Sequence, residues 1–140
     1  MQAGCSVYRL PDAVYVVAQI AVHGGGRVEA ALVARISPAT PAGTGAAVLT
    51  ALDRFRVAES LDDLEIVAAI ARHKEHGPPD GSGNWPAFHR DAKDAYVGAL
   101  ADGRLELISA PAGAEAPRAV RCPRDPAAIG AALLSLLPPG

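Results

Sequence analysis

Aromatic residues, cysteines and long apolar runs are all scarce in this sequence of 140 residues. Aromatics make up 4 % of the chain while apolar residues reach 50 %, so we expect a closely packed aliphatic core. No apolar run approaches the ~20 residues of a membrane-spanning helix, which argues against a membrane partner. Cys5 and Cys122 match neither a disulfide scaffold nor a metal-binding motif. We expect two reduced, buried thiols, with a single disulfide between them as the alternative.

An excess of positive charge is missing as well. Thirteen Lys and Arg residues stand against fifteen Asp and Glu, which gives a formal net charge of -2. Proteins that bind nucleic acid directly usually carry a basic surface, so no direct nucleic-acid partner is expected. Residues 1–9 also lack the basic and then apolar layout of a secretory signal. These features together predict a cytoplasmic protein.

Strand patterns occur at both ends of the chain. Residues 7–20 are rich in β-branched and aromatic side chains, with an interruption at Pro11-Asp12, and residues 27–36 form a second strand pattern. The glycine-rich turn at 23–26 between them predicts a hairpin. A second hairpin is predicted where 95–100 and 104–109 flank the two-residue turn Asp102-Gly103, and 118–122 is a further strand.

Four helices are predicted near residues 41–56, 60–76, 85–93 and 125–137. Thr40 and Asp125 each precede a proline and suit the N-cap position, and Asn84 suits it before the third helix. The first helix begins at Pro41 or, because two glycines weaken its first turn, at Thr44. Ser60 is the expected N-terminal cap of the second helix. Its apolar stripe is expected to face the core and consists of Leu64, Val67, Ala68 and Ala71.

The pattern as a whole predicts a single α+β domain over residues 1–140. Its antiparallel or mixed β-sheet would be packed against about four α-helices. No internal repeat and no sharp change of composition divides the chain.

Several short motifs resemble catalytic or metal-binding sequences without their context. His73 and His76 share a helix face, but zinc sites need three or four ligands with defined spacing, so no metal site is expected. A small ribonuclease or hydrolase remains the enzymatic alternative, since four histidines could supply an acid and a base. No pairing among them is evident from the sequence. The basic run of Arg118, Arg121 and Arg124 is typical of a solvated strand edge.

Charge is segregated between residues 57 and 70, which contain four acids and no base. One interpretation is compensation of the helix dipole at a helix start. The other is an acidic patch that captures a basic partner, because such patches steer association and fix specificity. Trp85 is either a core residue or an aromatic anchor for a partner. The predicted partner-binding residues are Glu59, Asp62, Asp63 and Glu65.

The order of the pieces resembles a known family. A small-residue helix at 44–52 precedes a helix at 84–93 centred on Trp85 and Phe88, followed by the Asp102-Gly103 hairpin and a closing helix at 125–134. This arrangement is similar to the immunity proteins (CdiI) of contact-dependent growth inhibition systems from Burkholderia-like proteobacteria. Residues 60–76 match the family least, so their interpretation rests on local physics alone.

The resemblance implies a non-enzymatic inhibitor without catalytic residues, cofactor or metal. Such a protein stays in the cytoplasm of the producing cell and binds the C-terminal toxin domain (CdiA-CT) of a large surface-displayed effector. The toxins of these systems are most often nucleases, commonly acting on tRNA, so inhibition by blocking the active site is expected. An adaptor domain with an unrelated partner is a third possibility, beside the small enzyme.

Overall fold

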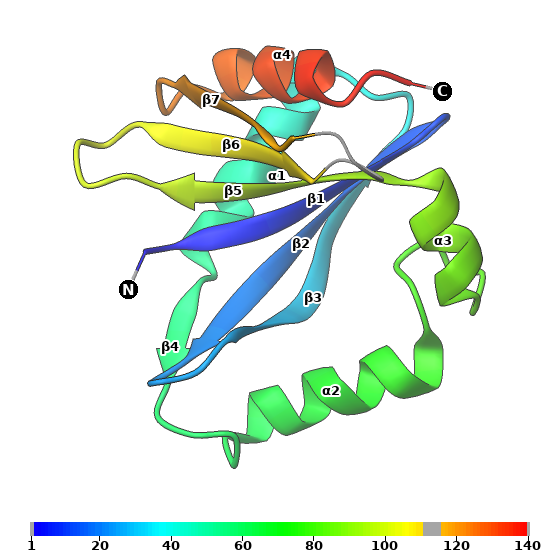
Figure 1. Ribbon diagram of the computed structural model, residues 1–140, viewed down its shortest axis with the longest axis vertical. Helices are drawn as coiled ribbons and strands as arrows, with labels where there is room; N and C mark the ends of the chain where they lie inside the picture. Colours follow the sequence, from blue (N-terminus) through cyan, green and yellow to red (C-terminus); the bar gives the residue numbers. More distant parts are fainter. Residues whose placement is uncertain (1, 111–115, 140) are drawn as a thin grey trace.

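Seven strands and four helices make up the computed structural model, which describes residues 2–110 and 116–139 (Figure 1). The strands are β1 (Gly4–Leu10), β2 (Ala13–Val22), β3 (Arg27–Ile36), β4 (Arg56–Ala58), β5 (Lys93–Ala99), β6 (Leu105–Ala110) and β7 (Arg118–Cys122). The helices are α1 (Pro41–Asp53), α2 (Leu64–His76), α3 (Trp85–Asp91) and α4 (Pro126–Leu136). The predicted α+β class, with a largely antiparallel sheet and four helices, is confirmed.

The strands form one sheet in the order β3-β2-β1-β5-β6-β7, and β4 pairs with β2 in addition. The interruption at Pro11-Asp12 is a tight turn that folds residues 4–22 into an antiparallel hairpin, with Leu10 opposite Ala13. The predicted hairpin of β2 and β3 is confirmed. β4 was not predicted; it pairs in parallel with the end of β2, from Ile20 to Val22, which β1 does not reach.

The second hairpin forms where it was predicted, between β5 and β6, but its turn is longer. The backbone N–H of Leu100 donates to the carbonyl of Arg104, so the loop holds the three residues 101–103. Gly103 closes it with a φ of 90°, a conformation that glycine adopts without strain.

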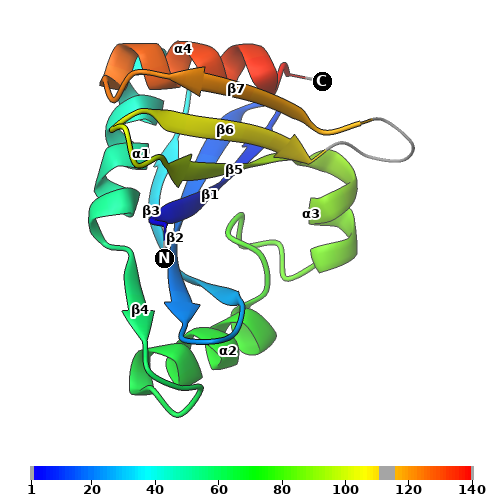
Figure 2. The ribbon, with the colours of Figure 1, turned by 60° about the vertical axis from the view of Figure 1, so that its left-hand side comes forward.

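Helices cover both faces of the sheet (Figure 2). β2 is buried along its whole length because its alternating side chains enter two different clusters. Val14 and Val16 belong to the large aliphatic core beneath α1 and α4, whereas Tyr15 and Val17 pack with Phe88 of α3 on the opposite face. The expected aliphatic core is therefore present, and the few aromatic residues of the chain are concentrated on its other side.

Side-chain caps fix the helix starts as predicted for three helices. Thr40 accepts the N–H of Gly43 at 3.3 Å, so α1 begins at Pro41. Asn84 and Asp125 cap α3 and α4 in the same way. The prediction of Ser60 as the cap of α2 is wrong. Asp63 caps this helix by accepting the N–H groups of Glu65 and Ile66, and Ser60 accepts the N–H of Asp62 in the preceding turn.

The face of α2 that packs inward also differs from the prediction. Leu64 and Val67, expected in the core, are 85 % and 52 % exposed. Ile66 and Ala69 are buried instead, and Ile66 packs with Ile20 and other residues at the end of β2. The helix has apolar residues on two opposite sides, so its periodicity predicts a helix correctly without showing which side meets the sheet.

Both cysteines are unpaired and buried, in agreement with the expectation of two thiols in the core. Burial raises the pKa of the Cys5 thiol to about 12, which keeps it protonated and unreactive. In the part of the chain that the structure describes, no helix is both long and apolar enough to cross a membrane.

Candidate partner-binding surface

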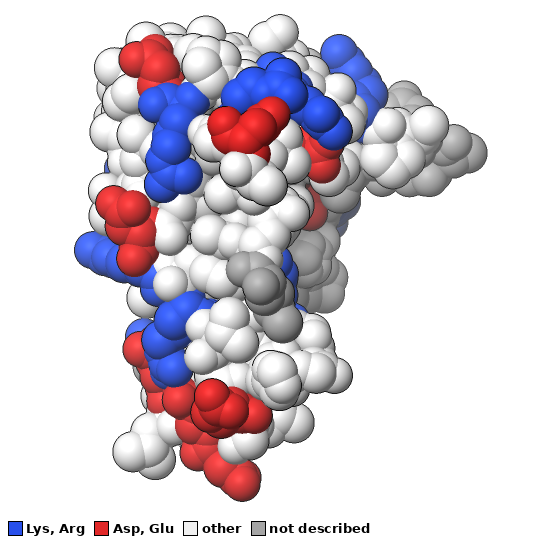
Figure 3. All heavy atoms as spheres, turned by 90° about the vertical axis from the view of Figure 1, so that its left-hand side faces the viewer, with Lys and Arg blue, Asp and Glu red and all other residues white. Residues whose placement is uncertain are grey.

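The four acidic residues predicted to bind a partner lie together in the connection from β4 to α2 and in the first turn of α2. Figure 3 shows acidic side chains gathered at the lower end of the molecule, where β4 leads into α2. Glu59 and Asp62 are exposed in the connection, and Glu65 is exposed on the helix. Asp63 is half-buried because its carboxylate caps the helix.

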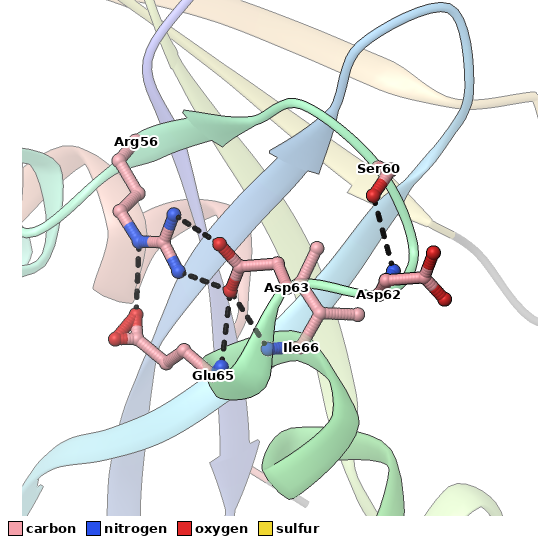
Figure 4. A network of polar contacts seen from close by, with 6 residues as sticks. All are labelled: Arg56, Ser60, Asp62, Asp63, Glu65 and Ile66. Carbon is pink, nitrogen blue, oxygen red and sulfur yellow. Dashed lines mark hydrogen bonds and ion pairs between the residues drawn. The ribbon is translucent and has the colours of Figure 1, made fainter.

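Arg56 of β4 binds two of these carboxylates (Figure 4). Its Nη1 and Nη2 donate to the two oxygens of Asp63 at 3.0 and 2.5 Å, and its Nε donates to Glu65 at 3.1 Å. The hydrogen bonds from Arg56 hold the pKa of Asp63 below its usual range, and they raise the pKa of Arg56. Asp63 and Glu65 therefore stabilise the start of α2, while no hydrogen bond or ion pair holds the side chain of Glu59 or Asp62 within the described residues.

Arg56 was missed because β4 was not predicted and because the residue lies just before the acidic segment. The acidic segment had two interpretations, compensation of the helix dipole and a partner-binding patch, and each fits different residues of the segment. Asp63 serves the helix start, as the dipole interpretation requires. Glu59 and Asp62 fit the surface interpretation, since their carboxylates lie outside the helix and are exposed.

Exposed apolar side chains are concentrated in the same segment. Of the seven large apolar side chains that are exposed among the described residues, five fall between positions 57 and 70. They are Val57, Leu61, Leu64, Val67 and Ile70, with Leu64 the most exposed at 85 %. Ile70 also lines the space between α2 and β3, so Leu61, Leu64 and Val67 are the candidates for a protein–protein contact.

A second group of polar side chains lies where α2 and α3 meet. The ring of Trp85 stacks on His73 of α2 at 4.1 Å and on His89 of α3 at 5.3 Å between ring centroids. The indole N–H donates to the carbonyl of His73 at 3.2 Å. Trp85 is half-buried and packs beside Phe88, so it connects α2 to α3 and packs against the aromatic cluster of Tyr8, Tyr15 and Phe88.

Glu29 of β3 lies near this group. The hydroxyl of Tyr8 donates to its carboxylate, and burial raises the pKa of both groups. The hydrogen bond from Tyr8 acts on the pKa of Glu29 in the opposite direction, as do the nearby side chains of His73 and His89. A cavity of about 320 Å³ opens between β3 and α2 and is lined by Glu29 and His73 together with Arg27, Val28, Ala69, Ile70 and Lys74. The sequence did not reveal this pairing of a carboxylate with histidines, because Glu29 lies 44 residues from His73 and further from His89 along the chain.

The other motifs are structural. His23 and the three glycines after it form the turn between β2 and β3. Arg121 of β7 pairs with Glu106 at 3.3 Å, and Arg124 after β7 pairs with Asp53 at 3.7 Å, so this basic run is partly neutralised. Across residues 2–110 and 116–139, no cluster of three or more His, Cys, Asp or Glu side chains is arranged to hold a metal ion.

The architecture is an α+β fold in which a seven-stranded sheet has helices on both faces. No protein-family model matches the sequence, and no curated protein is recognisably similar to it. Solved structures share the fold. One is a protein of unknown function from Neisseria meningitidis, with a TM-score of 0.68 and 17% identity over 98% of this chain and 94% of that one.

A second structure with this fold is a chain of the CdiA-CT/CdiI toxin and immunity complex from Yersinia pseudotuberculosis. Its TM-score is 0.65 at 17% identity, and the match covers 98% of both chains. This chain therefore shares its fold with one chain of that complex.

Proposed function

We propose that this chain is an immunity protein of a contact-dependent growth inhibition system. It would stay in the cytoplasm of the producing cell and bind the C-terminal toxin domain of the cognate effector. The observation that carries the proposal is the similarity of fold, over nearly the whole of both chains, to a component of a CdiA-CT/CdiI complex.

The charge of the chain supports the immunity component over the toxin. A nuclease toxin has to hold phosphates with cationic side chains. This chain has a net charge of -2 and exposes acidic and apolar side chains on one segment. Such a surface suits an inhibitor that occupies the substrate site of a cationic nuclease and requires no cofactor or metal.

Co-purification tests the proposal. The purified chain is mixed with the purified C-terminal toxin domain of a candidate effector. We expect a stable heterodimer, loss of the toxin's nuclease activity, and rescue of growth in cells that produce the toxin. A toxin domain from an unrelated effector serves as the control. Full toxin activity in the presence of excess chain would reject the proposal.

A small ribonuclease is the second candidate, and one arrangement favours it. His73 and Glu29 line one cavity, so a base and an acid lie together there, and His89 stacks on the same Trp85 ring as His73. Incubation of the purified chain with total RNA and tRNA decides between the two. Cleavage that disappears in both His73→Ala and His89→Ala would establish the enzyme and reject the inhibitor.

A further inference from the structure

The outward side of α2 carries an apolar stripe that the described part of the chain leaves exposed. Leu64, Val67, Ala68 and Ala71 recur at the spacing of one helix face. Leu64 is 85 % exposed and Val67 52 %, and Leu61 in the turn before the helix is 62 % exposed. Isolated apolar residues on a surface are ordinary, whereas a clustered set marks a contact site.

The fold does not need this stripe. The inner side of α2 is anchored by buried Ile66 and Ala69, and its start is fixed by Asp63 and Arg56. Arg72 also donates to the carbonyl of Ala30 in β3 at 3.1 Å. The outward leucine and valine therefore contribute little to folding, and their burial would become favourable only against another molecule.

The charges beside the stripe restrict what that molecule can be. Glu59 and Asp62 flank Leu61, and residues 57–70 contain no basic side chain. Arg56, the base that precedes them, is bound by Asp63 and Glu65. The edge of the apolar stripe beside Leu61 is therefore negative, which favours a partner with lysines or arginines around an apolar centre and disfavours an acidic one there.

We infer that residues 57–70, the turn before α2 and the outward side of its first half, form the surface that docks on the toxin domain. Leu61, Leu64 and Val67 enter an apolar site on the toxin. Glu59 and Asp62 face the basic residues with which a nuclease holds its substrate's phosphates. This inference rests on the proposed function and places the toxin contact on residues 57–70.

The apolar centre is tested with the double variant Leu64→Ser/Val67→Ser. Both side chains are exposed, so its thermal unfolding should match that of the wild type. Affinity for the purified toxin domain, measured by biolayer interferometry, should fall at least tenfold, because central apolar residues dominate such contacts. Val120→Ser is the matched control, since Val120 is 38 % exposed on β7, and its affinity should stay unchanged.

The acidic edge is tested with Glu59→Gln/Asp62→Asn. We expect association with the toxin domain to slow severalfold at low salt and the difference to shrink as salt is added, with dissociation little changed. Asp12→Asn is the control, because Asp12 is exposed in the turn between β1 and β2, away from this segment. An unchanged association rate at low salt would remove the two carboxylates from the contact.

The outcomes separate the surface from the function. Tight wild-type binding that Leu64→Ser/Val67→Ser does not weaken would overturn the docking surface and leave the immunity function standing. Failure of the wild type to bind or inhibit the toxin would overturn both. Light scattering should show a monomer; a dimer that the double variant dissociates would assign the stripe to a second copy of the chain and overturn the inference.

Discussion

Gly45 of α1 and Gly130 of α4 have reciprocal positions where the two helices cross. Gly45 lies against the backbone of Pro126, the first residue of α4, and Gly130 lies against the backbone of Pro41, the first residue of α1. A Cβ atom at either glycine would lie 1.7 Å from the carbonyl oxygen opposite. The two helices can therefore approach this closely only with glycine at both positions.

Gly45→Ala and Gly130→Ala should each destabilise the protein by about 3 kcal/mol, the upper range for overpacking, because backbone has to move to admit the methyl group. In an ordinary helix interior, Gly→Ala stabilises by about 1 kcal/mol. A loss of stability at these two positions would therefore show that the close helix contact outweighs helix propensity. Urea denaturation measures the free energy of unfolding. Ala131→Gly, at an exposed position of α4, should cost only about 1 kcal/mol. Wild-type stability in Gly45→Ala would contradict the close approach.

Thr44→Val should stabilise the protein by about 1 kcal/mol. Thr44 is fully buried in α1, and its hydroxyl has no hydrogen-bond partner within the described residues. Valine keeps the branched shape and removes the polar atom. Thr50→Val is the control, since the hydroxyl of Thr50 donates to the carbonyl of Ala46 at 3.2 Å and its loss should not stabilise. Equal effects of the two substitutions on the urea midpoint would argue against this explanation.

Replacement of Asp63 should destabilise α2 in two stages. Asp63→Asn keeps an oxygen for the helix cap and loses the ion pair with Arg56, so it should be less harmful than Asp63→Ala, which loses both. Arg56 lowers the pKa of Asp63 from its usual 3.8, so the carboxylate stabilises the folded state above that pH. The contribution is lost as the pH falls below 3.8 through the folded pKa. Acid titration of helical circular dichroism should show this loss in the wild type and not in Asp63→Asn.

Glu29→Gln should raise stability at neutral pH. Burial raises the pKa of Glu29 from 4.5, so its protonated form is favoured in the folded protein. Protonated Glu29 therefore contributes to the free energy of unfolding below pH 4.5, and this contribution is lost as the pH rises through the pKa that Glu29 has in the folded protein. Glutamine resembles the protonated form, so the stability that the variant gains over the wild type, measured from urea midpoints, should grow as the pH rises above 4.5. A variant that loses stability relative to the wild type as the pH rises would indicate that Glu29 is stabilised as the anion.

Local chemistry predicted the elements whose signals are short in range. Thr40, Asn84 and Asp125 cap their helices as expected, because a capping side chain reaches only two or three residues ahead. Asp63 replaced Ser60 as the cap of α2 because its carboxylate also binds Arg56, a contact that depends on β4. β4 has only three residues and forms because it pairs with β2. The sequence of β4 alone gives no sign of this pairing.

Features that depend on distant segments could not be predicted. The apolar residues of α2 form two opposite faces, and contact of Ile66 with the end of β2 selects one of them. Likewise, His73 and His89 come together only through Trp85, because α2 and α3 meet there. The acidic segment is evident in the sequence, but the division of its carboxylates between the helix start and the exposed surface depends on Arg56.

The crossing of α1 and α4 also has a consequence for biosynthesis. α4 follows α1 by more than seventy residues, and the large core closes only when both helices lie on the sheet. During translation, the apolar side of α1 therefore stays exposed to solvent until α4 has left the ribosome. Contacts between such distant segments slow folding, so the newly made chain matures late, after almost all of the described fold has been synthesised.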